Sequence, residues 1–221
     1  MSSPTLPDTR RAVILGGGRT LLAVCSAILL SSRHNRSIDW AVFIDRVTAI
    51  ASNSRLNEAE MVDQISALTG VLDWHDASLR RILGVSAKRL LFPVFSDIMT
   101  RLSFQLRLIT LERRNLLPLH DHPRMAGVTI CVKGKVRVRQ FDVLRNHQLH
   151  GRLIQCVSDR ELNASEYSSF TSDRANLHVV DALAFSQMID VFLPAYDERR
   201  QSETRIYRVE ETTNPSICLA I

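Results

Sequence analysis

The sequence LPLHDHP, residues 117–123, carries the most informative pattern in this 221-residue chain. Its histidines, His120 and His122, are two positions apart, so a β-strand would point both imidazoles to the same face. Two neutral imidazoles on one rigid strand provide half of a site for iron, zinc, copper or nickel. Because a His-x-His pair also occurs often without function, the prediction depends on what surrounds it.

A third histidine supplies that support. His178 lies in the apolar stretch NLHVV, residues 176–180, which predicts a second strand. Strands far apart in sequence come together in a β-barrel, where inward-facing residues alternate with outward-facing ones. We therefore predict a metal site formed by His120, His122 and His178 inside such a barrel.

The sequence around these motifs is rich in strand patterns. Residues 102–108 alternate apolar and polar side chains and predict a half-buried strand. Residues 128–132 and 136–139 flank Gly134, which permits positive φ, and predict a hairpin. Further strands are predicted at residues 148–157 and 184–193.

Before the barrel, residues 20–83 have a helical apolar period. One helix is predicted to begin after Ser37 as its cap, and another after Asn57, with Glu60 placed to complete a capping box. A short helix at residues 77–83 precedes Gly84. We predict an α+β protein in which residues 1–84 form a helical segment and residues 85–221 form the barrel with the metal site.

Composition excludes several other classes of protein. The net charge is +5, but Lys and Arg are scattered among Asp and Glu and no nucleic-acid-binding motif is present, so we expect no nucleic-acid partner. The four cysteines lie far apart and form no Cys-x-x-Cys pair, which argues against a structural zinc site or a disulfide framework. A cytoplasmic protein with reduced thiols is expected.

The first thirty residues superficially resemble a signal peptide. Three glycines at residues 16–18 interrupt the apolar run and leave only residues 21–30, which are too few to cross a bilayer. We expect a buried helix there and no membrane partner.

The motifs together resemble those of a cupin, a small antiparallel β-barrel whose first motif contains His-x-His and whose second contains one more histidine. The usual cupin also has a glutamate four or five residues after the second histidine, where this chain has Ala126 and Gly127. More specifically, the chain resembles the thiol dioxygenases related to cysteamine dioxygenase and the plant cysteine oxidases. The matching patches, in order, are PLHDHPRM (118–125), KGKVRV (133–138), FD (141–142), NLH (176–178), IDV (189–191), PAY (194–196) and TRIY (204–207).

This resemblance implies the cofactor and further site residues. The cofactor would be Fe(II), held by the three histidines. Asp190 would orient a ligand imidazole or a nearby water, and Tyr196 would donate a hydrogen bond at the substrate or at oxygen. The family usually has glycine where this chain has Arg124, so Arg124 could bind an acidic group of the substrate or narrow the entrance.

The function that we expect is oxidation of a thiol to its sulfinic acid with O2. Without a ligand carboxylate the metal keeps its full charge, which favours binding of a thiol as thiolate. The substrate would be a peptide with an N-terminal cysteine or an aminothiol such as cysteamine, and the protein would act as a monomer. Two alternatives remain open: a cupin enzyme that uses zinc or manganese for hydrolysis or isomerisation, and a non-catalytic cupin that binds a ligand.

Overall fold

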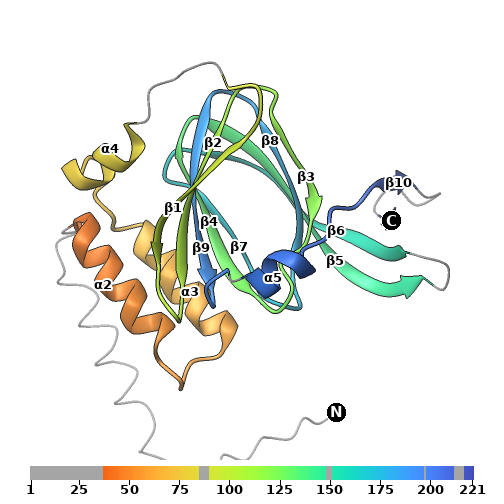
Figure 1. The fold of residues 1–221 in the computed structure, drawn as a ribbon, viewed down its shortest axis with the longest axis horizontal. Coiled ribbons are helices and arrows are strands. Elements are labelled where there is room, and N and C mark those ends of the chain that lie inside the picture. Colours follow the sequence, from red (N-terminus) through yellow and green to blue (C-terminus); the bar gives the residue numbers. More distant parts are fainter. Residues whose placement is uncertain (1–36, 85–89, 148–150, 197, 212–216) are drawn as a thin grey trace, which may run out of the picture. The chain divides into compact units, whose positions relative to one another are not determined.

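The protein is represented by a computed structural model, which describes residues 37–84, 90–147, 151–196, 198–211 and 217–221. The helix expected near residues 21–30 lies outside the described residues. Three helices precede the strands in the described part, and Figure 1 shows them beside the barrel. They are α2 (Trp40–Ala51), α3 (Glu58–Thr69) and α4 (Ala77–Leu83).

The helix starts follow from side-chain caps. The predicted capping box of α3 is confirmed, because Asn57 accepts from the Glu60 backbone while the Glu60 side chain accepts from the Asn57 backbone. The prediction that Ser37 caps α2 is wrong. Asp39 is the cap, and its carboxylate accepts a hydrogen bond from the Val42 N–H at 2.8 Å.

Eleven strands in the described residues form two antiparallel sheets that curve around a common interior (Figure 1). The five-stranded sheet has the order β1 (Val94–Thr100), β2 (Gln105–Leu111), β9 (Ser186–Leu193), β4 (Ala126–Lys133) and β7 (Tyr167–Phe170). The six-stranded sheet has the order β10 (Val209–Glu211), β11 (Ile217–Ala220), β6 (Gly151–Asn163), β5 (Lys135–His147), β8 (Leu177–Ala182) and β3 (Leu116–His120). The short helix α5 (Glu198–Glu203) follows β9.

The predicted hairpin around Gly134 is wrong, although both of its strands exist. β4 pairs with β7 and β9 in one sheet, whereas β5 pairs with β6 and β8 in the other. Gly134 has φ 82°, as expected, but it turns the chain from one sheet into the other instead of folding it back. A side chain there would collide with the Phe185 carbonyl, so glycine is also required sterically.

The helices cover the outer face of the five-stranded sheet. Leu106 and Leu108 of β2 are buried in one core with residues of α2, α3 and α4. The polar residues that alternate with them, Gln105 and Arg107, therefore lie on the opposite face of β2, which is the interior of the barrel. The predicted fold class is confirmed: an antiparallel β-barrel of the cupin type with a helical layer N-terminal to it. Within the described residues, no helix is both long and apolar enough to cross a membrane.

Candidate metal centre

The three predicted histidines meet inside the barrel. His120 is the last residue of β3 and lies directly opposite His178 on β8, while His122 lies two residues beyond the end of β3. The ring centroids are 4.8 Å apart for His120 and His122, 4.5 Å for His120 and His178, and 5.0 Å for His122 and His178. One nitrogen from each ring lies within 4.8 Å of the other two, which is close enough for all three to share one ion.

The local environment keeps the imidazoles neutral, as metal ligands must be. Burial is the main cause that lowers the pKa of all three, and the neighbouring histidines lower the pKa of His122 and His178 further. The His120 Nδ1 lies 2.8 Å from the Pro118 carbonyl oxygen. Donation to that carbonyl fixes the proton on Nδ1 and leaves Nε2 as the free ligand atom.

Both ring nitrogens of His122 and the Nδ1 of His178 are buried without a hydrogen-bond partner among the described residues. Unpartnered buried nitrogens are costly in a folded protein unless something else binds them. A transition-metal ion shared by the three rings would bind one nitrogen of each, which would remove part of this cost and fits the convergence of three neutral donors.

Asn176 holds His122 in place although His122 lies outside a strand. The buried Asn176 side chain accepts a hydrogen bond from the His122 N–H at 2.8 Å. Its amide nitrogen lies 3.1 Å from the carbonyl oxygens of both His122 and Met125, and 2.9 Å from that of Thr171. Asn176 precedes β8 by one residue, so this one side chain ties the backbone of His122 to the strand that carries His178.

The structure also explains why no ligand carboxylate is present at Gly127. A side-chain carbon built there would lie 2.7 Å from the Phe170 ring and 2.8 Å from the Val191 carbonyl oxygen, which is too close for any residue larger than glycine. The Phe170 ring instead stacks on His122, with centroids 5.1 Å apart.

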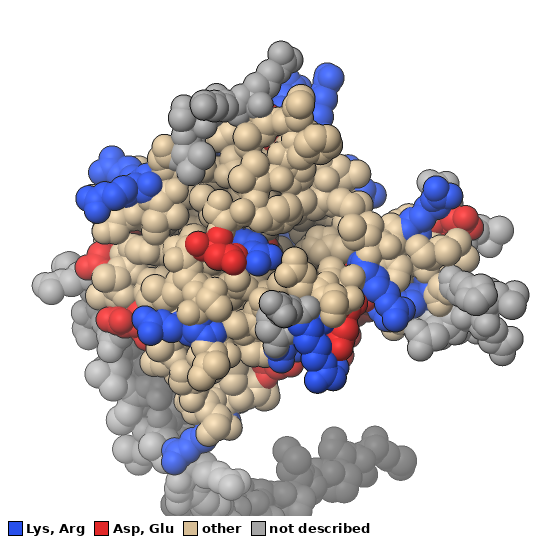
Figure 2. All heavy atoms as spheres, in the orientation of Figure 1, with Lys and Arg blue, Asp and Glu red and all other residues tan. Residues whose placement is uncertain are grey.

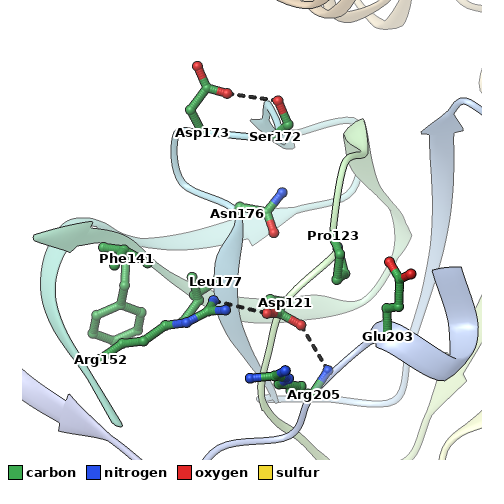
Figure 3. A pocket seen from close by; sticks show the side chains of 11 residues that line it. Asp121, Pro123, Phe141, Arg152, Ser172, Asp173, Asn176, Leu177, Glu203 and Arg205 are labelled. Carbon is green, nitrogen blue, oxygen red and sulfur yellow. Dashed lines mark hydrogen bonds and ion pairs between the residues drawn. The ribbon is translucent and has the colours of Figure 1, made fainter. Parts of the chain in front are cut away.

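Asp121, between the two ligand histidines, points to the other side of the chain. Figure 3 shows its carboxylate between Arg152 and the backbone of Arg205. It accepts hydrogen bonds from Arg152 at 3.1 Å, from the Arg205 N–H at 2.8 Å and from the Tyr207 hydroxyl at 2.7 Å. Asp121 therefore anchors the segment after α5 against the back of the histidine strand.

A cavity of about 550 Å³ opens onto the three histidines. Asp190 and Tyr196, the other two predicted site residues, both line it. Burial raises the pKa of Asp190 to about 6, while a hydrogen bond from Thr129 and the positive charge of Arg107 act in the opposite direction. The Asp190 Oδ1 is buried without a partner among the described residues, so no direct bond from it to a ligand imidazole is present there.

Tyr196 lies against the histidines. Its ring centroid is 5.8 Å from that of His122 in an edge-on contact, and its hydroxyl bonds the Thr204 hydroxyl. Its backbone N–H donates to the Gln105 side chain at 3.1 Å. Burial raises the pKa of the Tyr196 hydroxyl, which therefore stays protonated at neutral pH. Its proton goes to Thr204, because the Thr204 hydroxyl itself donates to the Arg200 carbonyl at 3.0 Å.

Arg124, the third position that we singled out from the resemblance, does not line this cavity. It has φ 57°, the left-handed region that suits the glycine usual in the family. Its guanidinium forms an ion pair with Glu203 at the end of α5. A contact with substrate thus stays a prediction for Arg124.

Two charged residues of the cavity were missed by the sequence analysis. Asp97 of β1 and Arg107 of β2 are cross-strand partners, and Arg107 in turn pairs in register with Asp190 of β9. The Arg107 Nε donates to the Asp97 carboxylate at 2.7 Å. Arg107 could have been found only by knowing that the polar face of β2 lines the barrel interior.

An antiparallel β-barrel with three histidines converging in its interior places this chain among the metal-binding cupins, and the lack of a ligand carboxylate sets it apart from the usual member. Within this class, the sequence profile of the PCO_ADO family matches residues 86–218. The chain therefore belongs to the PCO_ADO family, the family of cysteamine dioxygenase and the plant cysteine oxidases, and the resemblance seen in the sequence is confirmed.

Individual relatives are distant. The chain is 28% identical over 159 residues to the 2-aminoethanethiol dioxygenase of Mus musculus, covering 62% of this chain and 62% of the mouse protein. It is 28% identical over 136 residues to the Homo sapiens protein of the same name, covering 51% of this chain and 50% of that protein. The chain thus matches less than two thirds of the length of either relative.

Solved structures similar to this chain include other cupins. A cupin superfamily protein from Desulfitobacterium hafniense is 9% identical, with a TM-score of 0.39, over 50% of this chain and 85% of that one. An RmlC-like cupin from Shewanella frigidimarina is 15% identical, with a TM-score of 0.39, over 51% of this chain and 85% of that one.

Proposed function

We propose that this protein is an iron-dependent thiol dioxygenase that converts a thiol to its sulfinic acid. In this reaction the S–H group takes up both atoms of one O2 molecule, so that RSH and O2 give RSO2H. The observation that carries the proposal is the cluster of three neutral histidines with no carboxylate at Gly127. Membership of the PCO_ADO family supports the same reaction.

His120, His122 and His178 would hold the Fe(II). Bound there, the iron would supply a dipositive charge that favours thiolate and a redox centre that activates O2. Phe170 and Phe192, with ring centroids each 5.1 Å from that of His122, surround the site with apolar surface and limit the access of water.

The substrate that we propose carries a free amine beside its thiol. Such a compound could bind through both groups, which would orient it better than a thiol alone. Cysteamine and a peptide with an N-terminal cysteine both meet this requirement.

Asp190 and Tyr196 are proposed to position the reactants. Tyr196 lies against His122, and its hydroxyl proton is directed to Thr204 in the structure, so Tyr196 would donate to a reactant by exchanging Thr204 for that partner. Asp190 would act on a ligand imidazole through a water molecule, since its unpartnered Oδ1 has hydrogen-bonding capacity left. For Arg124, we propose an indirect role, in which its ion pair with Glu203 holds α5 beside the cavity.

Metal analysis and product mass test the proposal together. The purified protein should hold about one iron, and alanine at His120, His122 or His178 should remove both iron and activity. Zinc or manganese in place of iron, with no O2 uptake in the presence of thiol, would favour a different cupin enzyme. Retention of iron at the wild-type level in all three variants would show that this ligand set is wrong.

The rest of the chain is proposed to support this centre. Residues 1–84 would form the helical segment and residues 85–221 the barrel with the metal site, acting as a monomer whose mass in solution can be measured by light scattering. A cytoplasmic setting is supported by the described cysteines, Cys131, Cys156 and Cys218, which are all free thiols.

A further inference from the structure

A second cavity, of about 350 Å³, lies behind the strand that carries two of the metal ligands and is called the rear cavity below. Figure 3 shows it, and the residues that line it include Asp121, Phe141, Arg152, Leu177 and Arg205. None of its lining residues lines the cavity that opens onto the three histidines. Because binding pockets for small molecules begin at about 300 Å³, the rear cavity has room for a small organic molecule.

Two arginines bring unused hydrogen-bond donors to the rear cavity. The backbone N–H of Arg205 donates to Asp121, but its exposed guanidinium makes no hydrogen bond or ion pair with the described residues. Arg152 uses one terminal amino group, which donates to Asp121 at 3.1 Å. Its guanidinium carbon lies 5.5 Å from the centroid of the Tyr207 ring, and this cation–π contact restricts its orientation. Several N–H groups of the two guanidinium groups are therefore free to bind a ligand.

The acids of the rear cavity already have donors of their own. Both oxygens of Asp121 accept hydrogen bonds, and Glu203 pairs with two arginines that do not line the cavity. Asp173 accepts a hydrogen bond from the Ser172 hydroxyl at 2.7 Å, and Figure 3 shows it on the side of the cavity away from Arg152 and Arg205. The hydrogen-bonding capacity that remains is thus mainly that of donors, which suits an anion.

The surroundings limit the charge of such an anion. Asp121, Asp173 and Glu203 all line the cavity, so they would repel a doubly charged ligand more strongly than a singly charged one. In Figure 2, acidic side chains lie mostly beside basic ones on the face in view, and no broad positive surface is present there to attract a polyanion. Phe141 and Leu177, both buried in one apolar cluster, give the cavity a wall that suits an apolar body.

We infer that the rear cavity is a second binding site, which takes a small organic anion with one negative charge and an apolar body. The acid group of the ligand accepts hydrogen bonds from Arg205 and Arg152, and its body packs on Phe141 and Leu177. The inference does not rest on the proposed thiol dioxygenase function, because no metal ligand takes part in it.

The test uses benzoate, an aromatic carboxylate with one charge, as the probe. Its binding to the iron-loaded protein is measured by calorimetry in the absence of thiol and oxygen. Benzamide, which has a similar shape and no charge, and inorganic phosphate, which is mainly doubly charged at about pH 8, are measured in the same way. Benzoate should bind at least about tenfold more tightly than either, a difference of about 1.4 kcal/mol.

Two arginine variants show where benzoate binds. Arg205→Gln should weaken benzoate binding at least about tenfold, and it should fold normally because the Arg205 guanidinium has no partner among the described residues. Arg208→Gln is the matched control. It removes the same charge from an exposed residue of the same segment that does not line the rear cavity, so it should bind benzoate as the wild type does.

The outcomes are independent of whether the protein oxidises thiols. If benzoate binds the wild type and Arg205→Gln equally well, it binds somewhere else, such as at the metal, and the inference is wrong. A wild type that does not bind benzoate, or that binds benzamide or phosphate as tightly, would also overturn it. Loss of benzoate binding in Arg205→Gln but not in Arg208→Gln would support it.

Discussion

Replacing Asn176 with alanine should weaken the metal centre, although the Asn176 side chain is not itself one of the three metal ligands. The substitution removes the acceptor of the His122 N–H and the two amide N–H donors that serve the carbonyls of His122, Met125 and Thr171. Each hydrogen bond contributes about 1 kcal/mol net, and the backbone groups left behind are buried. The free energy of unfolding should therefore fall by about 3 kcal/mol.

The same substitution should weaken metal binding. The backbone of His122 would lose its link to the strand of His178, and the loss of such a supporting contact typically lowers metal affinity by about 10- to 100-fold. Urea unfolding of the metal-free protein measures the first effect, and competition with a chelator for iron measures the second.

Asn115→Ala provides the control for Asn176→Ala. The Asn115 side chain accepts one hydrogen bond, from the Glu112 N–H at 2.9 Å, in a turn away from the histidines. Its loss should cost about 1 kcal/mol and leave iron affinity unchanged. If Asn176→Ala cost no more than Asn115→Ala and held iron as tightly as the wild type, the reasoning about this contact would be refuted.

Three further predictions concern the cavity and its edge. Gly127→Ala should cost about 1–3 kcal/mol in urea unfolding because its new carbon would collide with an aromatic ring, and an unchanged midpoint would contradict that packing. Because burial raises the pKa of Asp190 to about 6, the folded protein holds a proton between about pH 4 and 6 that the unfolded chain has released. The stability of the metal-free wild type should therefore fall relative to Asp190→Asn as the pH rises through that range, and a constant difference would argue against a buried Asp190. Arg124→Gly should change stability by less than about 1 kcal/mol, because its exposed ion pair is weak and its φ suits glycine. If Arg124 also binds an acidic group, KM should rise for acidic peptides and stay as it is for cysteamine.

The convergence of the three histidines could be predicted from the sequence, because side chains on barrel strands alternate between facing inward and facing outward. The two-residue spacing of His120 and His122 puts both on one face, and His178 lies in a later predicted strand. The local geometry differed from the prediction: His122 lies beyond the end of its strand, and the Asn176 side chain holds it there. A hydrogen bond between residues 54 positions apart leaves no local pattern in the sequence.

The errors have a common physical cause. The apolar and polar alternation of β2 predicts one buried face, but the sequence does not say that helices cover the apolar face and that the polar face lines a cavity. For this reason the half-buried strand predicted at residues 102–108 gave no sign that Arg107 lines the cavity beside Asp190. The prediction of a hairpin at Gly134 was wrong for a similar reason. Two consecutive strands joined by a glycine turn can pair with each other in one sheet or belong to two different sheets, as β4 and β5 do here.

The most direct test of the proposed function uses two peptides that differ only at the N-terminus. One begins with a free cysteine and the other with N-acetylcysteine, and each is incubated with the iron-loaded protein and isotopically labelled O2. Acetylation removes the basic amine and should leave the thiol as a single, poorly oriented ligand. We predict that the free peptide gains two labelled oxygen atoms and that its acetylated twin gains none. Equal oxidation of both peptides would contradict binding through the amine, and no mass gain in either would contradict the dioxygenase function itself.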